Sequence, residues 1–192
     1  MRNIFSEKKA AHVAAFFLFQ NAGRLNILKL MKLLYLAERR SYQLYGEPMI
    51  GDTLVSMDHG PVLSRTLDRL NGMSTSTECG LNSWMTIREG HDVVLRDPSV
   101  IRSPEEDLLE LSDADINVLS ETWAEFGHLT QYQIRDYTHD HCAEWVDPEG
   151  SSLPITVETL LSVLEFDEPQ TRALLQKLEE RSAINAAFST SV

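Results

Sequence analysis

Residues 26–46 read Asn26-Ile-Leu-Lys-Leu-Met-Lys-Leu-Leu-Tyr-Leu-Ala-Glu-Arg-Arg-Ser-Tyr-Gln-Leu-Tyr-Gly46, and they carry the strongest helix signal in the chain. Their apolar residues recur at helical spacing and form one stripe, which consists of Ile27, Leu30, Leu34 and Ala37 and is widened by Met31 and Leu33. Asn26 can cap the first turn with its side chain, and Gly46 stands where a C-terminal cap glycine belongs. The pattern predicts a long helix whose apolar stripe faces the core.

Weaker signals on both sides of this segment predict further helices. Capping residues, helical spacing and terminal glycines or prolines mark helices over 6–21, 60–71, 112–126, 130–137, 156–166 and from 167 onward. The helix at 60–71 is expected to open with the Gly60-Pro61 step, because proline suits the first turn of a helix. Residues 73–83 are small and polar, with no period that would bury a face, and they predict a mobile loop.

Two regions predict β-structure. Residues 53–57 have the pattern of a short strand or extended segment. Residues 84–88 and 92–96 flank a glycine-containing loop, which is the layout of a hairpin. Neither an internal repeat nor a linker long enough to divide domains is visible. We therefore predict a single, predominantly helical α+β domain with a small antiparallel β element.

Composition limits the class of protein. The chain has 192 residues, of which 43% are hydrophobic, and this fits one globular domain. No apolar run approaches the roughly 20 residues that a membrane span needs, and the start of the chain lacks a signal-peptide pattern. Cys79 and Cys142 are too few for a disulfide framework. We expect a cytoplasmic protein with free thiols and no membrane contact.

The net charge of −12 argues against nucleic-acid binding, because an acidic protein is repelled by phosphate. The charge is unevenly distributed. Residues 1–48 hold eight Lys/Arg and three Asp/Glu, whereas the other 144 residues hold nine and 26. A basic face beside an acidic body can steer a charged partner, and a merely solvated surface is the alternative interpretation.

Reactive side chains cluster in one segment only, which contains His139, His141 and Cys142. These residues could bind a metal, or Cys142 could act as a nucleophile with a histidine base. Two histidines two residues apart point to different faces of a helix, however, and no second ligand pair with zinc spacing is present. The step Asp58-His59 has no nucleophile near it in the sequence, and the glycine patterns that bind phosphate are absent. We expect no catalysis, no cofactor and no metal.

Three segments together resemble a known family. They are Leu28-Lys-Leu-Met-Lys-Leu-Leu-Tyr-Leu-Ala-Glu-Arg39; Tyr45-Gly-Glu-Pro-Met49 followed by Asp58-His-Gly-Pro-Val62; and Leu129-Thr130 leading to Thr138-His139 and Trp145. Their order and spacing resemble the Panacea-domain antitoxins, which include SocA-like proteolytic adaptors and many phage-associated proteins. The resemblance covers roughly residues 8–150.

The resemblance implies an antitoxin that binds and neutralises a protein toxin encoded nearby, with an AAA+ protease as a further partner of SocA-like members. It divides the chain into a Panacea-like domain over 1–150 and a C-terminal helical extension over 151–192, which we expect to pack on the same domain. The alternative is a phage-associated DNA-binding transcriptional regulator. That role needs a basic patch, which only residues 1–48 offer. Homo-oligomerisation stays open at this point.

The resemblance also emphasises candidate residues for partner binding. They are His59, Gly60, Pro61, Arg65, Arg69, Lys29 and Lys32. Arginine and histidine are useful at interfaces, and we expect His59, Arg65 and Arg69 at the exposed start and flank of one helix. The same residues have a structural interpretation as well: Gly60-Pro61 can form a strand-to-helix turn, and the two lysines can be a solvated helix face.

Overall fold

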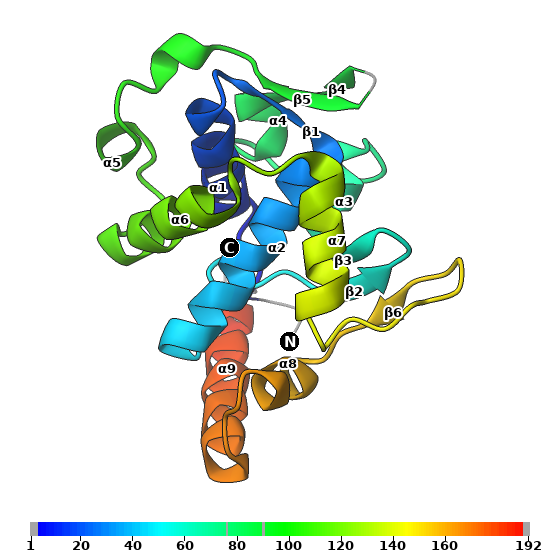
Figure 1. Cartoon of the computed structure of the whole chain (residues 1–192). Coiled ribbons are helices and arrows are strands. Elements are labelled where there is room, and N and C mark those ends of the chain that lie inside the picture. The colour runs from blue at the N-terminus through cyan, green and yellow to red at the C-terminus, as the bar shows by residue number, and fades with distance from the viewer. Residues whose placement is uncertain (1–3, 76, 90, 190–192) are drawn as a thin grey trace.

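The computed structural model describes residues 4–75, 77–89 and 91–189. Its helices are α1 (Glu7–Gln20), α2 (Ile27–Tyr45), α3 (Ser64–Leu70), α4 (Leu81–Trp84), the 3-10 turn η1 (Pro98–Val100), α5 (Pro104–Asp107), α6 (Asp113–Phe126), α7 (Gln131–His141), α8 (Val157–Val163) and α9 (Glu168–Ser189). Its strands are β1 (Arg24–Asn26), β2 (Leu54–Met57), β3 (Gly60–Leu63), β4 (Met85–Glu89), β5 (Asp92–Leu95) and β6 (Leu153–Pro154). The strands form antiparallel sheets of order β1-β5-β4 and β3-β2-β6 (Figure 1). The predicted helical α+β class is confirmed.

Helix α2 runs through the middle of the molecule, where it touches α1, α6, α7, α8 and strands of both sheets (Figure 1). Its two predicted caps are confirmed: the Asn26 side chain accepts a bond from Leu28 N, and Gly46 adopts the left-handed conformation with φ of 66°. The single apolar stripe predicted from the sequence underestimates how much of α2 is buried. Every residue from Leu30 to Glu38 is buried, so the middle of α2 has no solvent-facing side.

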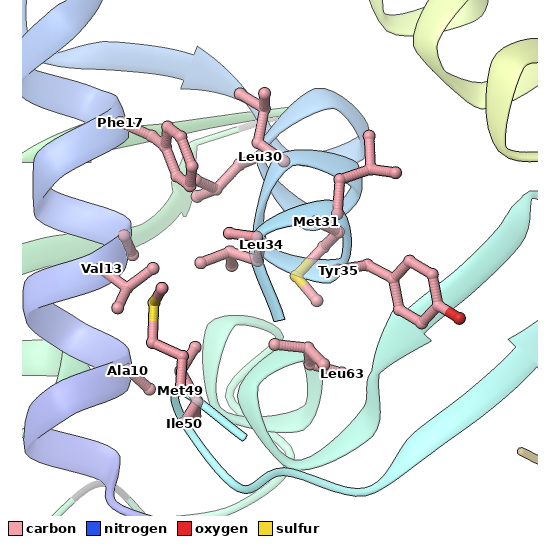
Figure 2. Close-up of a cluster of buried hydrophobic side chains, with 14 of the residues drawn as sticks. Ala10, Val13, Phe17, Leu30, Met31, Leu34, Tyr35, Met49, Ile50 and Leu63 are labelled. Atoms are coloured by element: carbon pink, nitrogen blue, oxygen red, sulfur yellow. The ribbon is translucent and has the colours of Figure 1, made fainter. Parts of the chain in front are cut away.

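The core lies mainly between α1 and α2 (Figure 2). Alanines dominate the middle of α1, and Ala10, Ala11, Ala14 and Ala15 are all fully buried. Small side chains let the two helices approach closely, so that Val13 and Phe17 pack toward α2. Met49, Ile50 and Leu63 add to this cluster from the segments that follow α2 (Figure 2).

The Gly60-Pro61 step lies in a strand, which corrects the predicted helix start. Strand β3 pairs with β2, with Ser56 opposite Pro61, and α3 begins only at Ser64. Proline is tolerated here because β3 is an edge strand, where a missing N–H costs no ladder bond. The start of α3 is capped instead from a distance. The Asp52 carboxylate accepts bonds from the backbone N–H groups of Arg65 and Thr66.

The hairpin predicted near residues 84–96 is confirmed, and β1 extends it to a third strand that the sequence pattern does not predict. The predicted loop over 73–83, of which residue 76 lies outside the described residues, differs in its second half. There Leu81 begins α4 and is fully buried. The carboxylate of Glu7 accepts bonds from the backbone N–H groups of Thr77 and Leu81. The buried carboxylate of Glu7 thus attaches residues 77–81 to α1, although this polar segment has no apolar pattern of its own.

The C-terminal helices pack against the C-terminal end of α2 (Figure 1). Leu160, Leu161 and Leu178 belong to the buried core, and Leu174 lies against Gly46, where a Cβ atom would be 2.6 Å from its side chain. Helix α7 also runs one turn beyond its predicted end, to His141. No helix in the described ranges is both long and apolar enough to cross a membrane.

Glu38 is a carboxylate in the buried middle of α2. Its two oxygens accept bonds from the backbone N–H groups of Ile50, at 2.7 Å, and Gly51, at 2.9 Å. Burial raises the pKa of Glu38 to about 7, although these two N–H bonds favour the charged form. The carboxyl group therefore fixes the turn between α2 and β2.

Replacing Glu38 with Gln should change how stability depends on pH. A carboxyl whose pKa is raised in the folded state stabilises most when protonated, so its contribution is complete below about 4.5 and is lost as pH rises through about 7. Relative to Glu38→Gln, the wild-type free energy of unfolding should fall across that window by at most about 1.4 kcal/mol per pH unit. Urea titrations at pH 5, 6 and 7 measure this, and parallel curves for the two proteins would contradict it.

Candidate functional site

Three segments that are far apart in the sequence meet around Gly60. Gly60 has a φ of +88°, and a Cβ atom at this position would lie 2.7 Å from Thr138 Oγ1 and 3.0 Å from Lys32 Nζ. Residues other than glycine rarely adopt this backbone conformation, and a Cβ atom would not fit into the space. Glycine therefore permits the β2–β3 hairpin, α2 and α7 to touch at one residue. We call Lys32, Gly60, Thr138, His139 and Trp145 the Gly60 cluster.

Lys32 is fully buried, and its Nζ donates a hydrogen bond of 2.8 Å to the carbonyl oxygen of Pro61. Burial lowers the pKa of Lys32 to about 7, because a low-dielectric surrounding disfavours the ammonium form. Among the described residues, no carboxylate forms an ion pair with it. The interpretation of Lys32 as part of a solvated face is therefore wrong, because this part of α2 is covered on all sides.

The segment after α7 wraps the outside of the hairpin. The His139 and Trp145 rings stack with centroids 4.1 Å apart and an interplanar angle of 6°. Trp145 Nε1 donates to the carbonyl oxygen of Met57 at 3.0 Å, and Val146 N donates to Ser56 Oγ. Burial lowers the pKa of His139, and the nearby Lys32 lowers it further. A neutral, stacked His139 thus holds the tryptophan against the hairpin.

A second buried network joins α2 to the same segment. Glu144 Oε1 accepts a bond from Tyr35 OH at 2.7 Å and from Arg39 Nε at 2.8 Å. Burial is the main reason why the pKa of Tyr35 lies well above its usual value, so the phenol remains a donor. These bonds fix the segment after α7 to the centre of the molecule.

The cluster of His139, His141 and Cys142 does not converge. His139 stacks on Trp145, whereas His141 lies against Tyr137 with ring centroids 4.4 Å apart. Burial raises the pKa of Cys142 to about 12, so its thiol is protonated at neutral pH and is a poor nucleophile. Across the part of the chain that the structure describes, no group of three or more His, Cys, Asp or Glu residues is placed to hold a metal.

A groove of about 630 Å³ opens beside the Gly60 cluster, between α2, the β2–β3 hairpin, α3 and the start of α7. We call it the α2–α7 groove. Its apolar lining consists of Ile27, Leu28, Met31, Met57, Val62 and Leu67. Its polar lining includes Asn26, Asp58, His59, Asn71, His91, Gln131, Tyr132 and Ser151. Apolar walls with a few polar groups are typical of binding sites, and the volume lies within their range of roughly 300–1,000 Å³.

The candidate residues divide between different places. His59 is exposed, and it lines the groove together with Gly60 and the buried Lys32. Pro61 is buried and does not line the groove, and its carbonyl oxygen accepts the hydrogen bond from Lys32 Nζ. Lys29 points elsewhere, because its Nζ donates to the carbonyl oxygen of Gly127 at 2.7 Å and lies 5.5 Å from the Trp123 ring centroid. Partner contact by these residues remains a prediction.

Arg65 and Arg69 lie on a different face from the groove, and they are not the exposed flank that the sequence predicts. Arg69 Nε lies 2.6 Å from Glu7 Oε2, and its side chain is only 14% exposed. Both guanidinium groups also cover the ring of Phe5, with Cζ 4.2 and 5.0 Å from its centroid. Leu67, two residues from either arginine, faces the groove instead. These arginines join α3 to the N-terminal segment.

The predicted basic face of residues 1–48 is largely neutralised by the fold. Four of its seven described cations pair with acidic residues from later in the chain: Lys9 with Asp115, Arg24 with Asp92, Arg39 with Glu144, and Arg40 with Glu121 and Glu125. Lys32 is buried and Lys29 binds a backbone carbonyl, while Lys8 is exposed. A charge count along the sequence cannot show these pairs. The acidic partner lies 68 positions from Arg24 and 105 from Arg39, in elements that meet only after folding.

The sequence pattern does not indicate most of the groove. It places Met57 in a strand and Leu67 on the buried face of a helix, and it does not single out Tyr132. Tyr132 is 58% exposed at the start of α7, and an aromatic residue two positions after the helix cap Thr130 is the one local signal that could have indicated it. The apolar lining residues that are only half-buried cannot be distinguished from fully buried ones by any pattern along the sequence.

Gly60→Ala should destabilise the protein through a direct clash with Lys32 and Thr138. Gly150 provides a matched control, because its φ is +85° and nothing lies within 4 Å of the place that a Cβ atom would take. We expect Gly150→Ala to cost about 1 kcal/mol of unfolding free energy, from backbone strain alone, and Gly60→Ala to cost at least about 2 kcal/mol more. Equal losses in urea unfolding would show that the close packing at Gly60 is unimportant.

Lys32→Met should alter stability in the opposite pH direction to Glu38→Gln. The pKa of Lys32 is lowered in the folded state, so its contribution is complete above about 10.5 and is lost as pH falls through about 7. The wild-type free energy of unfolding, relative to Lys32→Met, should therefore rise between pH 7 and 10 by up to about 1.4 kcal/mol per pH unit. Denaturant titrations of both proteins at pH 7, 8 and 9 check this slope, and a difference that stays constant would refute it.

The part of the chain that contains this site matches a known protein family. The family model of the antitoxin SocA-like, Panacea domain matches residues 30–146, a range that begins within α2 and ends just after Trp145. It therefore spans the whole Gly60 cluster. No curated protein and no solved structure gives a significant match. The chain belongs to the SocA-like, Panacea-domain family of antitoxins.

Proposed function

We propose that this antitoxin neutralises a cognate toxin protein, encoded nearby, by binding a segment of that toxin in the α2–α7 groove. The observation that carries the proposal is the position of the groove. Lys32 and Gly60 line it, so two residues of the Gly60 cluster, which lies within the range that the family model matches, also form the groove wall. Its role is binding without catalysis.

The chemistry of the groove suits a protein partner. Its apolar lining can desolvate anchoring side chains, which carry most of the free energy in protein interfaces. Tyr132 stands at the edge with 58% of its surface exposed, and tyrosine is enriched among such anchors. Asn71, Gln131 and Ser151 supply polar groups around the opening, which can orient a bound segment.

The alternative role in DNA binding has less support. It depended on the cations of residues 1–48, and most of these are paired or buried in the fold. The net charge of −12 opposes contact with phosphate as well. Delivery of the toxin to an AAA+ protease is a second step that resemblance to SocA-like members implies. The groove accounts for the binding step that must come first.

Leu28→Glu should weaken toxin binding without unfolding the protein. Leu28 is half-buried in the groove wall, in the first turn of α2, where a carboxylate is compatible with the helix dipole. We expect a loss of about 2 kcal/mol or more in binding free energy, the usual effect at a buried anchor. Growth rescue on co-expression with the toxin and calorimetry on the purified pair measure it.

Leu109→Glu is the matched control, because Leu109 is 81% exposed and does not line the groove. It should leave rescue and affinity unchanged. If both variants rescue growth as well as the wild type does, the toxin binds elsewhere, and the C-terminal extension over 151–192 becomes the next surface to test.

A further inference from the structure

The floor and the rim of the α2–α7 groove have different chemistry. Met31, Val62 and Ile27 form a buried apolar floor. One carboxylate, that of Asp58, is in the lining, and two more, those of Asp68 and Glu149, belong to residues that flank lining residues along the chain; we call these three the rim carboxylates. Glu149 precedes the lining residue Gly150, and Asp68 lies on α3 between the lining residues Leu67 and Asn71.

These rim carboxylates lack cationic partners. Within the described residues, none of the ion pairs includes Asp58, Asp68 or Glu149. Asp58 Oδ1 accepts one bond from Gly150 N at 3.0 Å, which leaves its charge uncompensated. Asp58 and Glu149 are exposed, and Asp68 is half-buried.

The cations nearest the groove are already engaged. Lys32 is the one lysine of the described lining, which contains no arginine, and its Nζ is buried against Pro61. Arg135 lies over Tyr132, with Cζ 5.4 Å from the ring centroid, and its Nη2 is 2.6 Å from Asp136. Arg24, two residues before the lining Asn26, pairs with Asp92. The rim is therefore acidic, while the floor is apolar.

We infer that the α2–α7 groove binds a toxin segment whose apolar side chains are flanked by lysine or arginine. The inference rests on the proposed function and names the chemistry of the bound segment. Apolar side chains fill the floor, and the flanking cations compensate Asp58, Asp68 and Glu149. The net charge of −12 attracts such a segment over longer distances, an effect that salt screens.

Synthetic amphipathic peptides of leucine and lysine are the probe, and fluorescence anisotropy with the full-length protein is the measurement. One peptide places all leucines on one helix face, a second has glutamate in place of every lysine, and a third has the first composition in scrambled order. The first should bind, and the other two should bind much more weakly. Equal binding of the first and scrambled peptides would indicate mere attraction to an acidic protein and would overturn the inference.

Rim variants test where the charge acts. The triple variant Asp58→Asn, Asp68→Asn, Glu149→Gln should weaken the lysine peptide about tenfold at low salt, since rim charges mainly affect encounter and salt dependence. The control triple variant Glu106→Gln, Glu165→Gln, Glu179→Gln removes the same charge at exposed positions outside the groove, and it should change affinity less than about twofold. Ser151→Trp, which fills the opening, should abolish binding. Equal losses in both triple variants, or full binding by Ser151→Trp, would contradict the inference.

The cognate toxin separates this inference from the proposed function. If the rim triple variant neutralises the toxin and binds it as tightly as the wild type does, the segment is not basic, although the antitoxin role stands. If the wild type fails to neutralise the toxin but binds the lysine peptide selectively, the groove chemistry stands and the proposed function is wrong.

Discussion

The structure depends on the burial of α2 with two ionisable side chains in its middle. Water cannot reach Lys32 or Glu38, so each must be satisfied by protein groups, because an unpaired buried polar group is costly. Lys32 is bound by the Pro61 carbonyl oxygen, and Glu38 by the backbone N–H groups after Met49. Helix α2 thereby positions the β2–β3 hairpin through Lys32, and it positions the loop before that hairpin through Glu38. The groove lies beside the first of these contacts, where the hairpin meets α2 near Lys32.

Local signals in the sequence are sufficient to predict most helices and strands, but they do not predict which residues surround each side chain. The long helix, its Asn26 and Gly46 caps and the helical α+β class follow from spacing and capping, which depend on neighbouring residues. Lys32 is buried by residues that are distant in the sequence, because Pro61 lies 29 positions away and Thr138 lies more than 100 positions away. Helical spacing alone therefore places Lys32 on a polar face. Pro61 is misleading for the same reason, because proline suits both a first helical turn and an edge strand.

The site is predictable only in part. Resemblance to the family singles out His59, Gly60 and Lys32, which the structure brings together, and also Arg65 and Arg69, which it places against Glu7 and Phe5. Those arginines stabilise the attachment of the N-terminal segment. Charge counted along the chain likewise suggests a basic face, whereas folding pairs four of those cations with later acidic residues and leaves an acidic rim at the groove. Only the three-dimensional arrangement distinguishes a cation that is available from one that is already bound.

The sheet of order β3-β2-β6 has a proline in each of its edge strands, Pro61 in β3 and Pro154 in β6. An edge strand with free N–H groups can recruit a strand from another molecule and start aggregation, and proline removes one of those donors. Both sides of this small sheet are therefore poor templates for strand addition. This sheet is thereby protected from self-association along its edges, and binding at the adjoining groove, as proposed above, would use side chains instead of strand pairing with this sheet.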